Sequence, residues 1–146
     1  MLSVTRIFHF SAAHRLFQYD GDCGKIHGHN YEVRVKLSSH VCNGQGMVVD
    51  FKDIKKMLGA WIDEELDHSL MLHVLDPLCK EPVILANAKL CILHVNPTAE
   101  MLAAYIRIKT EKFVYGKYTS AVDVASVIVY ETHNSFAEDT SHVSCK

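Results

Sequence analysis

Hydrophobic and polar residues alternate along the first segment of the chain, roughly from Leu2 to His14. Successive side chains of a strand point to opposite faces, so this alternation predicts a strand. One of its faces would hold Phe8, Phe10, Ala12 and His14. A second alternating run, from about His27 to Ser38, predicts another strand, one face of which would hold His27, His29, Tyr31, Val33 and Val35. Asp and Gly residues cluster between Phe17 and Lys25 and predict a loop between the two strands.

A helical period replaces the alternation after Asp50. Asp50 is predicted to cap the N-terminus of a helix, and Asp53 would complete a pair that resembles a capping box. The apolar stripe of this helix comprises Ile54, Met57, Leu58, Trp61 and Ile62. A second helix is expected to begin near Asn96-Pro97-Thr98, with a stripe formed by Met101, Leu102, Tyr105 and Ile106.

Valine and isoleucine are concentrated from about Ala121 to Glu131 and predict a third long strand. A turn at His133-Asn134-Ser135 would lead into a short final strand, although the segment from Phe136 to Lys146 is unusually polar for one. The order β-β-α-α-β-β indicates an α+β fold, with a mostly antiparallel sheet of at most four strands and two helices on one face. The segment from Leu70 to Val95 is ambiguous, because its apolar run from Val83 to Leu93 fits a strand or a helix.

The composition excludes several classes of protein. The chain has 146 residues, which fits a single domain covering 1–146, and a formal net charge of −2. Its lysines and arginines are scattered, so no nucleic-acid partner is expected. It has no apolar run of the ~18 residues that a membrane span requires, and its N-terminus lacks a signal-peptide pattern. Its five cysteines form no C-x-x-C pair, which fits the reduced thiols of a cytoplasmic protein.

Ten histidines are the unusual feature of the composition. In His27-Gly28-His29, residues i and i+2 of a strand point the same way, so both imidazoles can reach one ion. If the two strands pair as a hairpin, His14 can supply a third ligand. Three neutral imidazoles with an open fourth position describe catalytic zinc. The alternative is that the His-x-His pair is a chance or surface feature.

Three further features suggest acid–base chemistry, and each has a simpler interpretation. Cys23 can be a thiolate beside the metal, a fourth zinc ligand or an inert thiol. Asp67 can orient the ring of His68 as a proton carrier, or the pair can be an exposed helix end. Glu131 can accept the paired N–H groups of a heterocycle, or it can be a charge at the end of a strand.

Five motifs then occur in the order found in one known family. They are Phe10-Ser11-Ala12-Ala13-His14-Arg15-Leu16, Cys23-x3-His27-Gly28-His29-Asn30-Tyr31, Leu66-Asp67-His68, Asn96-Pro97-Thr98-Ala99-Glu100 and Tyr130-Glu131-Thr132. Together they resemble the 6-pyruvoyltetrahydropterin synthase family, which has the T-fold architecture. The three residues between Cys23 and His27 resemble the spacing of its bacterial branch, the 6-carboxytetrahydropterin synthases of queuosine biosynthesis.

The resemblance implies a role for each matching residue. The implied roles are zinc binding by His14, His27 and His29, proton transfer by Cys23, Asp67 and His68, and pterin binding by Glu131, Thr98 and Glu100. The implied substrate is 7,8-dihydroneopterin triphosphate, which the carboxy branch converts to 6-carboxy-5,6,7,8-tetrahydropterin, acetaldehyde and triphosphate. Subunits of this family join their sheets into a barrel and form sites between subunits, which implies a homo-oligomer, either a trimer or a hexamer.

Several alternatives remain at this stage. The protein can be a 6-pyruvoyltetrahydropterin synthase, which eliminates triphosphate and keeps the side-chain carbons. It can also be a non-catalytic zinc- or pterin-binding T-fold module, although Cys23, Asp67 and His68 are all present. A cysteine hydrolase using Cys23 and His68 is disfavoured, because zinc would occupy the space near the thiol. The chain also departs from the family in a probable insertion at about 73–94, in which Cys91 and His94 form an unpaired C-x2-H half-site.

Overall fold

A long hairpin forms the centre of the fold. The structure, a computed structural model, describes residues 1–118 and 121–140. Strand β1 (Leu2–His14) pairs antiparallel with β2 (His27–Ser39), from Leu2 opposite Ser39 to His14 opposite His27. The predicted strands and their hairpin pairing are confirmed. The loop between them contains one short 3-10 turn, η1 (Asp22–Gly24).

The hairpin lies inside a six-stranded sheet of order β4-β3-β1-β2-β5-β6. On one side, β5 (Asp123–Thr132) pairs antiparallel with β2, and β6 (Ser135–Asp139) pairs antiparallel with β5. The short final strand is therefore present. The end of the polar C-terminal segment, residues 141–146, lies outside the described residues.

Two short strands on the other side of the hairpin correct the predicted strand number. Strand β3 (Ser69–His73) pairs parallel with β1, and β4 (Lys89–Leu93) pairs parallel with β3. The first four residues of β3 are buried, so it shows no polar alternation that the sequence could reveal. The ambiguous run from Val83 to Leu93 divides between helix α2 (Pro82–Asn87) and β4. Neither a strand nor a helix alone describes that segment.

The first helix begins where it was predicted to begin. The Asp50 side chain accepts a hydrogen bond from the Lys52 N–H at 2.8 Å, and α1 (Phe51–Ile54) continues through two π-helical stretches, η2 (Lys55–Gly59) and η3 (Ile62–Leu66). The capping box is wrong. The Asp53 carboxylate instead accepts a hydrogen bond from the Tyr118 hydroxyl at 2.6 Å and pairs with Lys117.

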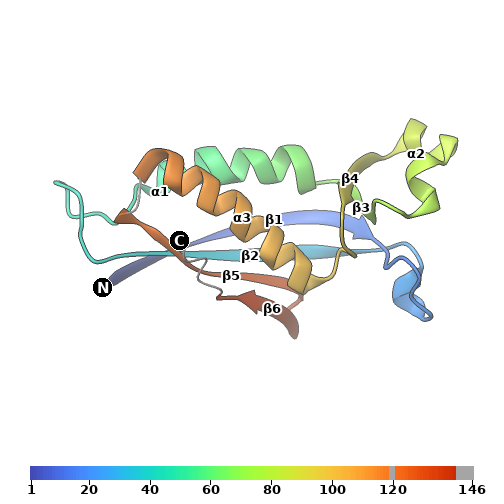
Figure 1. Cartoon of the computed structure of the whole chain (residues 1–146), viewed down its shortest axis with the longest axis horizontal. Coiled ribbons are helices and arrows are strands. Elements are labelled where there is room, and N and C mark those ends of the chain that lie inside the picture. Colours follow the sequence, from blue (N-terminus) through green and yellow to red (C-terminus); the bar gives the residue numbers. More distant parts are fainter. Residues whose placement is uncertain (119–120, 141–146) are drawn as a thin grey trace.

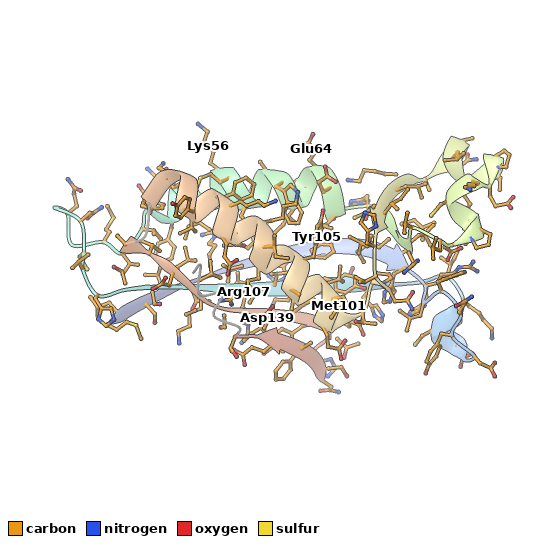
Figure 2. All side chains as sticks on the ribbon, viewed as in Figure 1. Lys56, Glu64, Met101, Tyr105, Arg107 and Asp139 are labelled. Atoms are coloured by element: carbon orange, nitrogen blue, oxygen red, sulfur yellow. The ribbon has the colours of Figure 1, made fainter. Side chains whose placement is uncertain are left out.

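The second long helix, α3 (Ala99–Tyr118), lies with the first helix on one face of the sheet (Figure 1). Its buried residues include Leu102, Ala103 and Ile106, whereas Met101 is 38% exposed, which corrects its place in the predicted stripe. Figure 2 shows Arg107 of α3 close to Asp139 of β6, and its guanidinium donates to the Asp139 carbonyl oxygen at 3.2 Å. The core lies between these helices and one face of the sheet, and includes Phe8, Phe10, Tyr31, Val33, Val35, Leu37, Leu58, Ile62, Val127 and Val129.

Among the described residues, no helix combines the length and the apolar character that a membrane span requires.

Candidate metal centre

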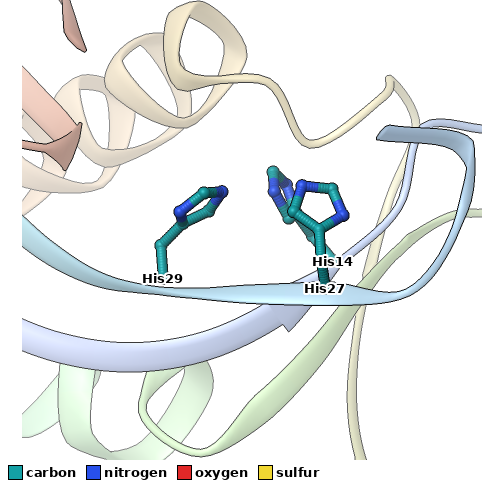
Figure 3. A group of neighbouring side chains, drawn as sticks. All are labelled: His14, His27 and His29. Carbon is teal, nitrogen blue, oxygen red and sulfur yellow. The ribbon is translucent and has the colours of Figure 1, made fainter. Parts of the chain in front are cut away.

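Three histidine rings meet at one end of the hairpin. His14 is the last residue of β1, and His27 and His29 lie at the start of β2 (Figure 3). The strand register sets His14 opposite His27 and Ala12 opposite His29, so the three side chains share one face. One ring nitrogen from each residue lies within 4.8 Å of the others. Within residues 1–118 and 121–140, this is the one group of histidine, cysteine or acidic side chains with such spacing.

Backbone carbonyl groups orient two of these rings. His14 Nδ1 lies 2.7 Å from the Pro97 oxygen, and His27 Nδ1 lies 2.8 Å from the Lys25 oxygen. Because a carbonyl oxygen only accepts, Nδ1 of each ring donates and Nε2 keeps its lone pair. His14 Nε2 is buried and has no hydrogen-bond partner among the described residues. This arrangement leaves Nε2 available as a metal ligand.

The electrostatic environment also suits a metal. Burial lowers the pKa of His14 to about 4; the hydrogen bond to Pro97 opposes this shift, and the neighbouring His27 and His29 add to it. His14 is therefore neutral near pH 7, as a metal-binding imidazole must be. The donor set consists of three imidazoles, which can hold a metal ion and leave a coordination position open.

Glu131, predicted to be a substrate-binding residue, lies beside this group. Its Oε1 atom is 4.0 Å from His14 Nε2, and its side chain is 26% exposed. Tyr31 was not predicted to be a site residue, yet its ring contacts the His14 and His29 rings edge-on. That hydroxyl is buried without a hydrogen-bond partner among the described residues, a signal that only a structure can give.

Cys23 does not belong to the metal group. It is exposed on η1, and its sulfur is not among the atoms that lie within 4.8 Å of one another. The fourth-ligand interpretation therefore has no support from this geometry. The next residue, Gly24, is closely packed, because a Cβ atom there would overlap the Tyr19 carbonyl oxygen. Cys91 is likewise outside the metal group; burial raises the pKa of its thiol to about 11.

Asp67 and His68 form the expected pair, but they lie outside the histidine group. Asp67 accepts the Ser11 N–H at 2.9 Å and lies 2.8 Å from His68 Nδ1; these bonds, the Ser11 bond first, lower the pKa of its carboxyl group. The His68 N–H donates to the Ser11 carbonyl oxygen at 2.7 Å. His68 has a φ of 57° and a ring that is 83% exposed, a strained arrangement of the kind found at functional sites.

His68 borders a cleft at the end of the hairpin that carries the triad. The cleft is lined by Ser11, Ala12, Ala13, Gly28, His29, Asn30, His68 and Ser69. Half of these positions alternate along the strands with the triad positions, whereas Ala12 and His29 share the face of the triad. The nitrogens of His68 are not among the ligand atoms that lie within 4.8 Å of one another, so His68 does not belong to the histidine group of its own chain.

The start of α3 lies next to the triad, because Pro97 contacts His14. Thr98 Oγ1 accepts the Met101 N–H at 3.4 Å and so caps the helix, and Glu100 is exposed in its first turn. The predicted pterin-binding roles of Thr98 and Glu100 stay predictions.

Comparisons with known proteins identify the family of the chain. The family model for 6-pyruvoyl tetrahydropterin synthase matches residues 3–141. The 6-carboxy-5,6,7,8-tetrahydropterin synthase of Rickettsia conorii is 34% identical over 139 residues, which cover 94% of this chain and 99% of that protein. The protein of the same name from Haemophilus influenzae is 28% identical over 144 residues, covering 94% and 98%.

Solved structures show the same fold. An uncharacterised protein of Wolinella succinogenes superposes with a TM-score of 0.83 at 22% identity, over 97% of this chain and 98% of that one. The 6-pyruvoyl tetrahydropterin synthase of Caenorhabditis elegans gives a TM-score of 0.69 at 25% identity, over 97% and 96%. The chain has the T-fold and belongs to the 6-pyruvoyl tetrahydropterin synthase family of lyases.

Proposed function

We propose that the protein is a zinc-dependent lyase that converts 7,8-dihydroneopterin triphosphate to 6-carboxy-5,6,7,8-tetrahydropterin, acetaldehyde and triphosphate. The main observation is the histidine triad, whose oriented rings converge beside the carboxylate of Glu131. The relatives named 6-carboxy-5,6,7,8-tetrahydropterin synthase support the carboxy branch. We also propose that 1–146 is one domain in the cytoplasm, where the free thiols of the described cysteines would stay reduced.

The roles of the binding residues follow from their chemistry. His14, His27 and His29 would hold zinc, which supplies Lewis-acid polarisation of a substrate hydroxyl. The Glu131 carboxylate has two oxygens that can accept the amino and ring N–H groups of a pterin. Thr98 and Glu100, at the start of α3, would help to orient the ring.

The proton-transfer residues require a second copy of the chain. Cys23 would abstract a proton near the metal, and His68, oriented by Asp67, would complete the relay. Because His68 lies outside the histidine group of its own chain, the His68 that serves a given triad would come from a neighbouring subunit. The edge of β1 that faces away from β2 pairs with no strand from Leu2 to Phe10 among the described residues, so a neighbouring sheet can join it. We propose a homo-oligomer, a trimer or a hexamer built on such a barrel.

Product analysis tests this function. Zinc-loaded protein is incubated with 7,8-dihydroneopterin triphosphate, and acetaldehyde and triphosphate are measured together. Release of both in equal amounts is the expected result. Triphosphate without acetaldehyde would assign the protein to the 6-pyruvoyl branch. Binding of substrate without either product would indicate a non-catalytic module.

A further inference from the structure

The loop that contains Cys23 is attached to two distant segments by side chains that have no assigned role. Asn96 Oδ1 accepts the Phe17 N–H at 2.8 Å, and Asn96 Nδ2 donates to the Phe17 carbonyl oxygen at 3.1 Å. The amide thus provides both hydrogen bonds that a neighbouring strand would provide. Arg15 donates two hydrogen bonds to the Asp76 carboxylate, at 2.7 and 2.5 Å.

The same contacts reach the metal centre and Cys23. Pro97, the residue after Asn96, accepts the hydrogen bond from the His14 ring. The Leu16 N–H donates to the Cys23 carbonyl oxygen at 2.8 Å. Residues 14–17 are therefore held along their whole length, from a metal-binding histidine to the backbone of the loop that presents the thiol.

The attachment includes a buried ion pair and a ring stack. The Asp76 side chain is fully buried, whereas that of Arg15 is 25% exposed, and a buried carboxylate is stable only when paired. The Phe17 ring also stacks on His73, with ring centroids 5.4 Å apart. Both His73 and Asp76 lie within the predicted insertion region at about 73–94. This region thus supports the Cys23 loop as well as extending the sheet.

We propose that Asn96 and Asp76 are positioning residues that hold the Cys23 loop in place relative to His14. The proposal rests on the proposed function, in which Cys23 transfers a proton. Proton transfer needs heavy atoms within about 3 Å of each other, and a misplacement of about 1 Å can cost about 10²-fold in rate. The side-chain hydrogen bonds of Asn96 go to Phe17, and Asp76 accepts those of Arg15, so both residues hold the segment that leads into the loop.

The test compares Asn96→Ala and Asp76→Asn with Asn87→Ala, a matched control. Asn87 is exposed on α2, where its side chain donates to the Val83 carbonyl oxygen. Zinc content, kcat and KM for 7,8-dihydroneopterin triphosphate, and hydrogen exchange of peptides covering residues 15–26 are measured for each. Exchange over α3 serves as the internal reference. Asn96→Asp, which keeps the acceptor for Phe17 and loses only the donor, provides the measurement if Asn96→Ala does not fold.

We expect exchange over residues 15–26 to accelerate by about tenfold in Asn96→Ala and Asp76→Asn, with zinc retained. We also expect kcat to fall about tenfold or more with a smaller change in KM, and Asn96→Asp to be intermediate. Unchanged exchange in that segment would overturn the proposal, as would faster exchange with wild-type kcat, which would mark a purely structural role. If the wild type forms no product, the proposed function fails, and the exchange result still decides whether the loop is held by these side chains.

Discussion

At the scale of single residues, the metal centre depends on side-chain alternation and on two backbone carbonyl groups. Alternation along β1 and β2 sets the three imidazoles on one face, so the sequence was sufficient to predict His14, His27 and His29 as a group. The carbonyl groups of Pro97 and Lys25 that orient the rings were not predictable, because a carbonyl oxygen belongs to every residue. Only the fold decides which one meets a histidine.

Replacing His29 with alanine should remove the metal while the fold persists. The ring is only partly buried, and the sheet beneath it is held by backbone pairing, so the metal-free forms should melt within a few degrees of each other. Metal analysis and circular dichroism measure both effects. His9→Ala, on the exposed face of β1, is the control. Full zinc occupancy in His29→Ala would reject the assignment of this residue as a ligand.

Replacing Cys23 with alanine distinguishes a proton carrier from a ligand. Since the thiol lies outside the metal group, zinc should remain bound, and turnover should fall by about 10²-fold or more. Cys42→Ala, which alters another exposed thiol, should keep wild-type turnover. Loss of zinc from Cys23→Ala would favour the ligand role, and near-normal turnover with zinc present would exclude the catalytic one.

At the scale of elements, patterns that depend on neighbouring residues were predictable, and patterns that depend on distant residues were not. The hairpin strands, the Asp50 cap and the valine-rich β5 follow from local periodicity. Strand β3 is too short and too buried to show a period, and β4 exists because β3 offers a parallel partner. Asp53 had the right spacing for a capping box, but Tyr118 and Lys117 of α3 compete for its carboxylate.

The Arg15–Asp76 pair should make stability depend on pH at the acid end. The hydrogen bonds from Arg15 lower the pKa of Asp76 in the folded state, so the folded chain resists protonation that the unfolded chain accepts. This stabilisation is complete well above the unfolded pKa of about 4 and is lost as the pH falls through the folded pKa.

Urea unfolding at several values between pH 7 and pH 3 measures this contribution. The wild type should lose more stability than Asp76→Asn over the acid part of this range, because the amide does not titrate. Asp76→Ala should be less stable than the wild type at pH 7 by about 3 kcal/mol, the usual cost of leaving one member of a buried pair unpaired. Parallel curves for the wild type and Asp76→Asn would show that the pair contributes no acid sensitivity.

At the scale of the whole molecule, the separation of His68 from the triad determines what a single chain can do. The nitrogens of His68 lie outside the histidine group of the same chain, although His68 and His29 line one cleft. We therefore expect an oligomer in which His68 of one chain serves the triad of another. Light scattering at micromolar concentration should then give a mass that is a multiple of one chain.

Mixed oligomers provide a sharper test than mass alone. Cys23→Ala and His68→Ala should each be nearly inactive as pure oligomers, because every site lacks one group. In oligomers formed by co-expressing the two variants in equal amounts, a site that takes Cys23 from one chain and His68 from its neighbour is intact in about one case in four, if the chains mix at random. Turnover should therefore recover to about a quarter of the wild-type value.

A double variant, Cys23→Ala with His68→Ala, is the control. Co-expressed with wild type, it gives the same quarter of intact sites if each site is shared between two chains. If both groups act within one chain, the two single variants recover nothing, whereas the double variant with wild type retains about half.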